Sequence, residues 1–485
     1  MSKPVSGRAS RGDWLRLGIA SMVVAGLAGC AAGPDYRQPP VDTPAAYKEA
    51  RPWKTAQPQA IDARHPWWTL YGDPTLDELV AAANTANQDI RQAEAQYRQA
   101  RSVADAAHAG FFPSVGLDAN ATRARTNTGS VIHVGNAENV GLTASWEPDL
   151  WGSVRRSVEA GQAGSAAAGA DLAAARLSIQ ATLVQDYFQL RAIDRQAQLY
   201  ARTVEAYQKA LQLTQSQHAA GVALRSDVAL AESQWQSAEA QRVDLQATRA
   251  QLEHAIAILT GQAPAAFTLP PVEGLGTAVP ALPPGLPSEL LERRPDIAAA
   301  ERRMAQANAN IGVARAAWFP SLQLGAGGGL ASSQLAPLFE APNRVWSLGA
   351  ALAATVFDGG LRAAHDAQAV AAYDATVAQY RQTVLAGFQE VEDNLATLRV
   401  LDQESVAQDR AVQAAQVAEQ LALNQYRAGT ANYLGVVTAQ ALLLANERSA
   451  VLLRGRQLVA SAALIKATGG GWDRAAPASM NKDTR

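Results

Sequence analysis

The chain has 485 residues, and its 42 basic and 44 acidic side chains leave a formal net charge of -2. So balanced a charge gives no general attraction to nucleic acid, and we expect no nucleic-acid partner. Apolar residues make up 48% of the chain, many of them alanine, which favours long helices over a thick core. Beyond residue 30 no run of about 18 apolar residues is found, so we predict no membrane-spanning helix; contact with a membrane would need a barrel or an anchor.

The first 29 residues are typical of an export signal. Basic side chains precede an apolar run from Leu17 to Leu27, and small residues lead to Cys30, the only cysteine. The string from Leu27 to Cys30 resembles the lipobox of bacterial lipoproteins, which implies a signal peptide at 1–29 and a covalent lipid on Cys30. By the same resemblance, Ala31 favours the outer membrane. The alternative is an ordinary signal peptide that happens to end near a cysteine.

Landmarks in the sequence recur at one offset. Phe319-Pro320-Ser321 repeats Phe112-Pro113-Ser114, Gly359 repeats Gly152, and Gly429 repeats Gly221, each 207 or 208 residues later. A constant offset predicts a tandem duplication. The predicted parts are a lipid-anchored extended segment at 30–74, repeat one at 75–262, a Pro-rich linker at 263–287, repeat two at 288–468 and a tail at 469–485.

Each repeat is predicted to begin with a helix, about Thr75 to Ala109 in the first and Asp296 to Ala317 in the second. Pro295 suits the first turn of its helix. Apolar residues then alternate with small or polar ones, which predicts strands near 113–122, 139–148, 320–330 and 345–356. We expect polar loops between them, from Arg123 to Asn139 and from Ala331 to Asn343. One such strand is as typical of a soluble sheet as of a membrane barrel, but two loop-connected pairs favour the barrel.

Two very long helices are predicted to end each repeat and to meet near Gly221 and near Gly429. Their apolar residues recur in steps of three, four and seven, which indicates a left-handed coiled packing; in the first helix they are Leu183, Tyr187, Leu190, Ala197, Tyr200, Val204, Tyr207 and Leu211. The proline-free run from Gly152 to Ala219 would span roughly 100 Å if helical throughout. A fibrous coiled coil would explain these helices but not the strands.

Four strands cannot close a barrel, and an open sheet edge is not stable in lipid. Two chains would give eight strands, which is too narrow for a passage, whereas three give twelve and a lumen. The predicted fold is therefore a mixed α and β membrane protein: a homotrimer with a twelve-stranded β-barrel, continued by a long coiled α-helical barrel.

Several motifs resemble the TolC-type outer-membrane efflux proteins, in particular their NodT-type lipoprotein branch. They are Gly33-Pro34-Asp35-Tyr36, Trp67-Trp68 with Asp73-Pro74, and above all the string from Glu289 to Ile297 followed by Phe319-Pro320-Ser321. The resemblance implies the exit duct of a tripartite efflux pump that exports drugs, solvents or metals. It also implies two partners, a periplasmic adaptor and an inner-membrane transporter.

The same resemblance implies a gate where the long helices meet. Ser226 and Asp227 match the position of a polar tie, Tyr426 matches its aromatic partner, and Leu434 matches an apolar constriction. Thr438 and Gly435 occupy a place where many relatives carry an acid, so a cation-selective ring is in doubt. Asp227 could equally be a helix cap, and Tyr426 ordinary heptad packing.

No catalytic motif is found, so the sequence predicts no enzyme and no cofactor other than the lipid on Cys30. The six histidines are scattered without metal-ligand spacing. Two alternatives stay open: a non-porous, structural coiled-coil lipoprotein of the envelope, and a type I protein-secretion channel. The sequence identifies neither the exported substrate nor the trigger for opening.

Overall fold

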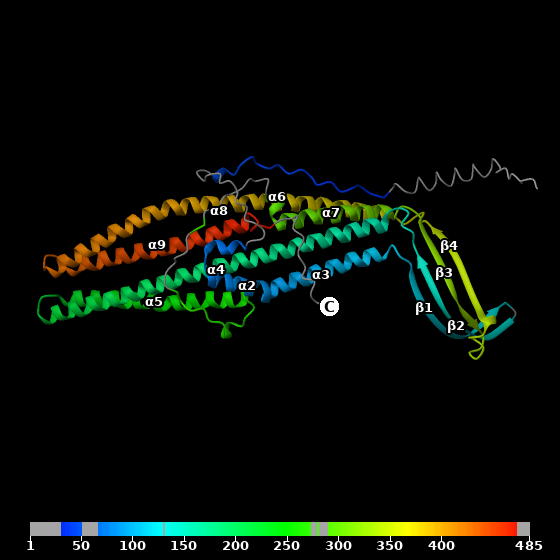
Figure 1. The fold of residues 1–485 in the computed structure, drawn as a ribbon, viewed down its shortest axis with the longest axis horizontal. Helices are drawn as coiled ribbons and strands as arrows, with labels where there is room; N and C mark the ends of the chain where they lie inside the picture. Colours follow the sequence, from blue (N-terminus) through cyan, green and yellow to red (C-terminus); the bar gives the residue numbers. More distant parts are fainter. Residues whose placement is uncertain (1–30, 51–65, 130, 273–278, 281–289, 473–485) are drawn as a thin grey trace, which may run out of the picture. The chain divides into compact units, whose positions relative to one another are not determined.

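A computed structural model describes residues 31–50, 66–129, 131–272, 279–280 and 290–472 (Figure 1). The predicted signal peptide, Cys30, most of the Pro-rich linker and most of the tail lie outside these residues. The chain divides into two units. One consists of residues 1–40, 97–168 and 300–380, and the other of residues 41–96, 169–299 and 381–485.

The first unit contains a four-stranded sheet in the order β1-β2-β3-β4, with every neighbouring pair antiparallel (Figure 1). Its strands are β1 (Ser114–Thr128), β2 (Val131–Trp146), β3 (Ser321–Ser332) and β4 (Arg344–Ala353). A strand therefore lies at each of the four predicted places. The outer edges of β1 and β4 have no strand partner within the part of the chain that the structure describes.

The predicted polar loop from Arg123 to Asn139 is wrong. β1 and β2 remain paired through this stretch, from Arg123 opposite Asn136 to Thr128 opposite Val131. They are joined by a tight turn at Gly129, whose φ of 74° suits glycine. Alternation ends near residue 122 because both faces of the hairpin carry polar residues beyond it, so periodicity could not reveal the rest of the strands.

The helix predicted from Thr75 to Ala109 is two helices, α2 (Pro74–Ala86) and α3 (Gln88–Ala109). Asn87 separates them: it is 3% exposed, and its side-chain oxygen accepts hydrogen bonds from the backbone N–H groups of Asp89 and Ile90. Its side-chain nitrogen donates to the Leu259 carbonyl at 2.9 Å. The break therefore depends on a residue distant in sequence.

The helices of the two halves match in length, as a tandem duplication requires. Helices α3 and α7 (Pro295–Ala316) have 22 residues each. The long helices α4 (Ser153–Ala219) and α8 (Leu361–Arg427) have 67 each, and α5 (Arg225–Leu259) and α9 (Tyr433–Ala467) have 35 each. The short helix α6 (Leu290–Arg293) and the 3-10 turns η1 (Lys48–Ala50), η2 (Trp67–Tyr71), η3 (Pro264–Ala266) and η5 (Ala341–Asn343) complete the described elements.

Most of the heptad residues of α4 form its buried face, including Leu183, Tyr187, Leu190, Tyr200, Tyr207 and Leu211. By length and composition alone α9 could cross a membrane, although it contains no run of about 18 apolar residues. The C-terminal part of α9 is nevertheless packed within the chain, since Leu458, Ala462 and Ile465 are at most 1% exposed.

The long helices end where the sequence predicts. Gly221 follows α4 with a φ of 75°, and Gly429 follows α8 with a φ of 74°. Both lie in the left-handed region that ends a helix without strain only at glycine. Each turn is closed by backbone hydrogen bonds, from Val222 to the Gln217 carbonyl and from Thr430 to the Gln425 carbonyl.

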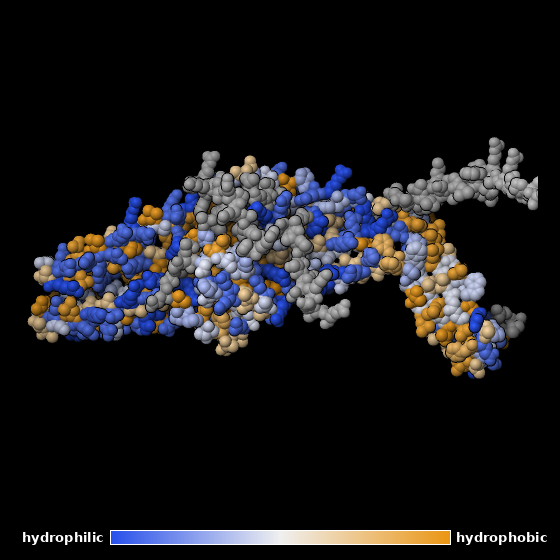
Figure 2. Space-filling model, in the orientation of Figure 1, coloured by the Kyte–Doolittle hydropathy of each residue, from blue (hydrophilic) through white to orange (hydrophobic). Residues whose placement is uncertain are grey.

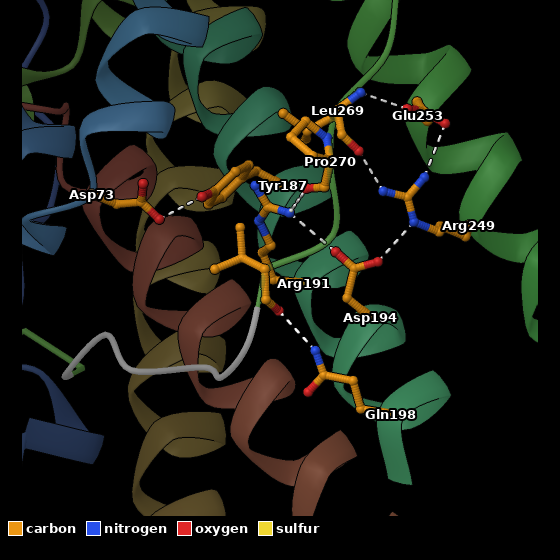
Figure 3. A network of polar contacts seen from close by, with 10 residues as sticks. Asp73, Tyr187, Arg191, Asp194, Gln198, Arg249, Glu253, Leu269 and Pro270 are labelled. Carbon is orange, nitrogen blue, oxygen red and sulfur yellow. Dashed lines mark hydrogen bonds and ion pairs between the residues drawn. The ribbon is translucent and has the colours of Figure 1, made fainter. Parts of the chain in front are cut away.

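A buried polar network fixes α4, α5 and the chain that follows them in the second unit (Figure 3). Asp194, whose side chain is 1% exposed, accepts hydrogen bonds from Arg191 at 3.1 Å and from Arg249 of α5 at 2.7 Å. Arg191 also donates to the Pro270 carbonyl at 2.8 Å, and Arg249 to the Leu269 carbonyl at 2.5 Å. Paired in this way, buried charges specify one arrangement of these segments.

Arg294 gives a structural role to the motif from Glu289 to Ile297 that contains it. Its guanidinium is held by Asp296 at 2.6 Å, by Glu390 of α8 at 2.7 Å and by the Ala467 carbonyl of α9 at 3.0 Å. Burial alone would lower the pKa of Arg294, but the two carboxylates raise it, so the group stays charged. One side chain thus joins the start of α7 to α8 and α9.

Candidate functional site

The two faces of the sheet differ sharply in chemistry. The strand register places apolar side chains of all four strands on one face. From β1 to β4 they are Val115, Leu117, Ala119, Ala121, Ile132, Val134, Val140, Leu142, Ala144, Trp146, Leu322, Leu324, Ala326, Leu330, Trp346, Leu348, Ala350 and Leu352. We call this the apolar face.

The opposite face carries small and polar residues, and we call it the small face. Asp118, Asn120, Asn139, Thr143, Gln323 and Ser347 lie there, interspersed with Gly116, Gly135, Gly141, Gly325, Gly327, Gly329 and Gly349. Asp118 accepts a hydrogen bond from the Thr143 hydroxyl at 2.8 Å across the β1–β2 pair. Most residues of this face are glycine, alanine, serine or threonine.

The apolar face is left uncovered by the described chain. Trp346 is 78% exposed, Leu348 76% and Leu117 72%, and Figure 2 shows apolar residues gathered along the sheet. A contiguous apolar surface of this kind is rare on a soluble monomer and marks contact with a membrane or another protein. On strands whose other face is small and polar, it is the pattern of a membrane barrel.

Exposed aromatic rings lie at both ends of the sheet. At the end nearest the helices are Phe112, Trp318, Phe319 and Phe357, and at the opposite end are Trp346 and Phe339. Two such aromatic girdles border the apolar band of membrane barrels, because their rings suit the interface between lipid and water. Trp151 adds a further aromatic ring at the end of the sheet nearest the helices, since it stacks on Phe319 with ring centres 4.8 Å apart.

The residues that follow Cys30 are docked against the beginning of α4. The backbone N–H of Ala32 donates to the Trp151 carbonyl at 2.9 Å, and Arg156 donates to the Ala32 carbonyl at 3.1 Å. Arg156, whose side chain is 6% exposed, also forms ion pairs with Asp35 and Glu159 at 2.8 and 2.7 Å. This docking site joins the first described residues to the helix that directly follows β2.

At the hairpin ends, the structure brings Tyr426 to the first hairpin, although not to the predicted partners. Its hydroxyl donates to the Gln217 side chain of α4 at 2.5 Å, and its ring lies 5.2 Å from that of Tyr433. No described hydrogen bond joins Tyr426 to Ser226 or Asp227. Gln217 was missed because nothing local in a run of helical glutamines distinguishes it from a solvent-facing residue.

Asp227 caps α5, which is the alternative role considered above. Its carboxylate accepts a hydrogen bond from the Leu224 backbone N–H at 3.2 Å. Ser226 beside it is exposed, and the structure assigns it no hydrogen bond. Neither arrangement tests a gating role in an assembly, so the gate assignment of these two residues stays a prediction.

Leu434 and Thr438 share an exposed face of α9, four residues apart. Leu434 is 54% exposed, and the Thr438 hydroxyl donates to the Leu434 carbonyl at 2.9 Å. Their neighbours Tyr433 and Val436, each 2% exposed, pack instead with Leu211 and Ala231. Both side chains therefore point away from the core of the hairpins, while the constriction at Leu434 and the gate position of Thr438 stay predictions.

Tyr433 is a second residue of this region that the sequence did not reveal. It lies in the apolar cluster that joins α4, α5 and α9, and burial raises its pKa to about 12. The signal that could have revealed it is Asn432, which caps α9 by accepting a hydrogen bond from the Gly435 N–H. Such a cap marks Tyr433 as the first residue of the helix, where an aromatic side chain can pack against the neighbouring helices.

Known proteins resemble this chain over almost its whole length. The family model described as outer membrane efflux protein matches residues 79–262 and again 286–470. The probable efflux pump outer membrane protein SepC of Pseudomonas putida is 33% identical over 460 residues, covering 92% of this chain and 95% of that protein. The pyoverdine export outer membrane protein OpmQ of Pseudomonas aeruginosa is 33% identical over 442 residues, covering 87% and 91%.

Solved structures agree with these sequence matches. The outer-membrane channel OprN has a TM-score of 0.86 at 32% identity, covering 91% of this chain and 100% of the other. The open state of the MtrE outer membrane channel of Neisseria gonorrhoeae has a TM-score of 0.82 at 30% identity, covering 92% and 99%. The family model thus matches the chain twice, once at each of the two predicted repeats. The chain belongs to the outer membrane efflux protein family, which is a family of transport proteins and not of enzymes.

Proposed function

We propose that this chain is the exit duct of a tripartite efflux pump, and that three copies enclose the passage. The observation that carries the proposal is the two-faced sheet. Its exposed apolar face suits the lipid of the outer membrane, and its small face suits a water-filled lumen. The long paired helices would continue that lumen into the periplasm.

The free edges of β1 and β4 support the trimer. A sheet edge exposes unpaired N–H and C=O groups, which are costly in lipid. Pairing β4 of each copy with β1 of the next removes every edge when the ring closes. Three copies give twelve strands, which leaves the lumen that an eight-stranded dimer would lack.

The partners and cargo are inferred from the relatives. A duct without a catalytic site or energy source needs an inner-membrane transporter, and a periplasmic adaptor would join the two. Relatives are named for export of toluene, antibiotics and pyoverdine. We infer that this chain likewise exports small molecules such as drugs, solvents or metals, since most side chains of its small face are small and uncharged.

We further propose that Cys30 carries a lipid. Support comes from the docking site of Ala32 on Trp151 and Arg156, which holds the residue two positions after Cys30 beside the aromatic rings at the helix end of the sheet. An acyl chain at that level would reach the inner leaflet of the same membrane. Each buried CH₂ would contribute about 0.8 kcal/mol to anchoring.

Two measurements test the duct. Light scattering of the full chain in detergent, corrected for detergent, should give three chains per particle, and the same preparation should form conducting pores in planar bilayers. In an efflux-deficient host, expression together with the matching adaptor and transporter should restore solvent or antibiotic tolerance. A monomer without conductance would contradict the proposal and favour the structural coiled-coil lipoprotein.

The lipid is tested separately. Cells grown with a radioactive fatty acid should label the wild-type chain but not Cys30→Ser, while both appear in the membrane fraction. Equal labelling of the two chains, or none in the wild type, would exclude acylation at Cys30 without bearing on the duct.

A further inference from the structure

Three arginines interrupt the apolar face at the end of the sheet farthest from the helices. Arg123 and Arg125 on β1 share the side of Val115, Leu117 and Ala119, and Arg344 on β4 shares the side of Trp346 and Leu348. All three side chains are exposed. Arginines on a face that would meet lipid need a polar counterpart, because an unpaired charge is costly there.

On their own strands the three arginines lie just outside the apolar residues of this face, while on β2 Val134 lies opposite Arg125 and Ile132 lies farther out. On β1 the last apolar residue of this face is Ala121, and the next outward position is Arg123. On β4 the last is Trp346, and the next is Arg344. In the proposed barrel a bilayer would set the apolar band at one height, so Arg123 and Arg344 would lie at the same level, where phosphate groups of the lipid begin.

Both strands that carry these arginines are edge strands of the sheet. In the proposed trimer, β4 of one copy pairs with β1 of the next, and paired strands lie about 4.8 Å apart. Arg344 would then approach the partner subunit's Arg123 and the partner subunit's Arg125. Each of the three junctions would gather three cations from two chains.

Few acids balance this charge. In the described part of the chain none of the three arginines forms an ion pair. Glu138 is the one carboxylate of the apolar face among the paired strand residues, and it lies inward on β2, opposite Ala121. Glu340 lies in the loop before β4. The arginines would therefore repel one another across the junction unless an anion separates them.

We propose that each subunit junction binds a phosphate group of the phosphorylated glycolipid in the outer leaflet, which bridges Arg344 of one chain and Arg123 and Arg125 of the next. This inference rests on the proposed trimeric barrel. Guanidinium groups bind phosphate through paired hydrogen bonds. A lipid suits the site better than a free phosphate ion, since the apolar band begins directly below with Trp346 and can hold the acyl chains.

The test compares two triple variants of equal charge change in the detergent-solubilised full chain. R123Q/R125Q/R344Q removes the site, and R202Q/R410Q/R448Q removes three exposed arginines of α4, α8 and α9. Affinity is measured for bisphosphorylated lipid A, for its dephosphorylated form and for inorganic phosphate. We expect the site variant to bind bisphosphorylated lipid A about tenfold more weakly than the wild type and the control. Dephosphorylated lipid A and inorganic phosphate should bind the wild type weakly.

A second readout tests the bridge. Bisphosphorylated lipid A should raise the temperature at which the wild-type trimer dissociates in SDS, and Arg344→Gln alone should lose most of that rise. Unchanged affinity in the site variant, a full rise in Arg344→Gln, or phosphate binding as tight as lipid would each overturn the inference. If one of these results is obtained and the wild-type trimer conducts, only the lipid site is overturned and the proposed duct is unaffected. If the wild type forms no trimer and does not conduct, the proposed duct itself is overturned.

Discussion

At the scale of single residues, Tyr426 and Gln217 form a hydrogen bond that links the two hairpins of one chain. Tyr426→Phe keeps the ring against Tyr433 and removes only the hydroxyl. We expect it to weaken the closed tip by about 0.5–1.5 kcal/mol, the usual net contribution of such a hydrogen bond. Single-channel recording should show more frequent opening than in the wild type.

A double-mutant cycle provides the control for that change. Since both side chains serve one hydrogen bond, Gln217→Ala and Tyr426→Phe together should cost little more than either alone. Fully additive effects would show that Tyr426 acts through its packing and that the bond to Gln217 is incidental.

The raised pKa of Tyr433 predicts a loss of stability in alkali. A group whose pKa is higher in the folded than in the unfolded state stabilises the fold fully below its unfolded pKa, here 10.0, and loses that contribution as the pH rises to about 12. Tyr433→Phe cannot ionise, so its stability should fall less between pH 9 and pH 11.5. Urea unfolding at both pH values measures this, and equal losses in the two proteins would assign the effect to other tyrosines.

Residues of this kind limit what the sequence can predict. The apolar alternation of Val115, Leu117 and Ala119 predicted which side chains share a face, because that pattern is local. The partner of Tyr426 lies 209 residues away, and the helix break at Asn87 depends on the Leu259 carbonyl. No local pattern encodes contacts over such separations.

At the scale of the elements, Gly329 controls how closely β2 and β3 approach. A Cβ there would lie 2.4 Å from the Val140 carbonyl oxygen, whereas one at Gly349, on the same small face, would meet nothing within 4 Å. Gly329→Ala should therefore cost about 1–3 kcal/mol through strain between the strands, and Gly349→Ala much less.

Semi-native electrophoresis of membrane extracts can measure this difference, since a destabilised sheet should lower the temperature at which the trimer dissociates. Equal dissociation temperatures for the two variants would mean that β2 and β3 adjust by a few tenths of an ångström without penalty.

At the scale of the whole molecule, the orientation of the sheet can be tested with two adjacent alanines of β4. Ala350 lies on the apolar face and Ala351 on the small face. An arginine in the lipid-facing band costs about 2–4 kcal/mol per chain near the midplane, whereas one in a lumen does not. Ala350→Arg should reduce insertion into the outer membrane, while Ala351→Arg should insert and shift conductance toward anions.

Fractionation and reversal-potential measurements distinguish the two variants. Normal insertion of Ala350→Arg with failure of Ala351→Arg would reverse the assignment of the faces. At this scale the sequence was informative, because the nearly equal spacings of Gly152 and Gly359, and of Gly221 and Gly429, already implied two copies of one unit. It could not reveal that the strands continue past residue 122, where Arg123 and Arg125 interrupt the apolar residues of β1.

The glycines of the small face have a consequence for how such a duct can change over generations. A wall made largely of glycine, alanine, serine and threonine presents nearly the same peptide and hydroxyl groups to every solute. Few substitutions could then sharpen its preference for one cargo without also narrowing the passage. Adaptation to a new toxic compound would then require changes in the transporter and the adaptor. A single outer-membrane component could be retained while those partner proteins diverge.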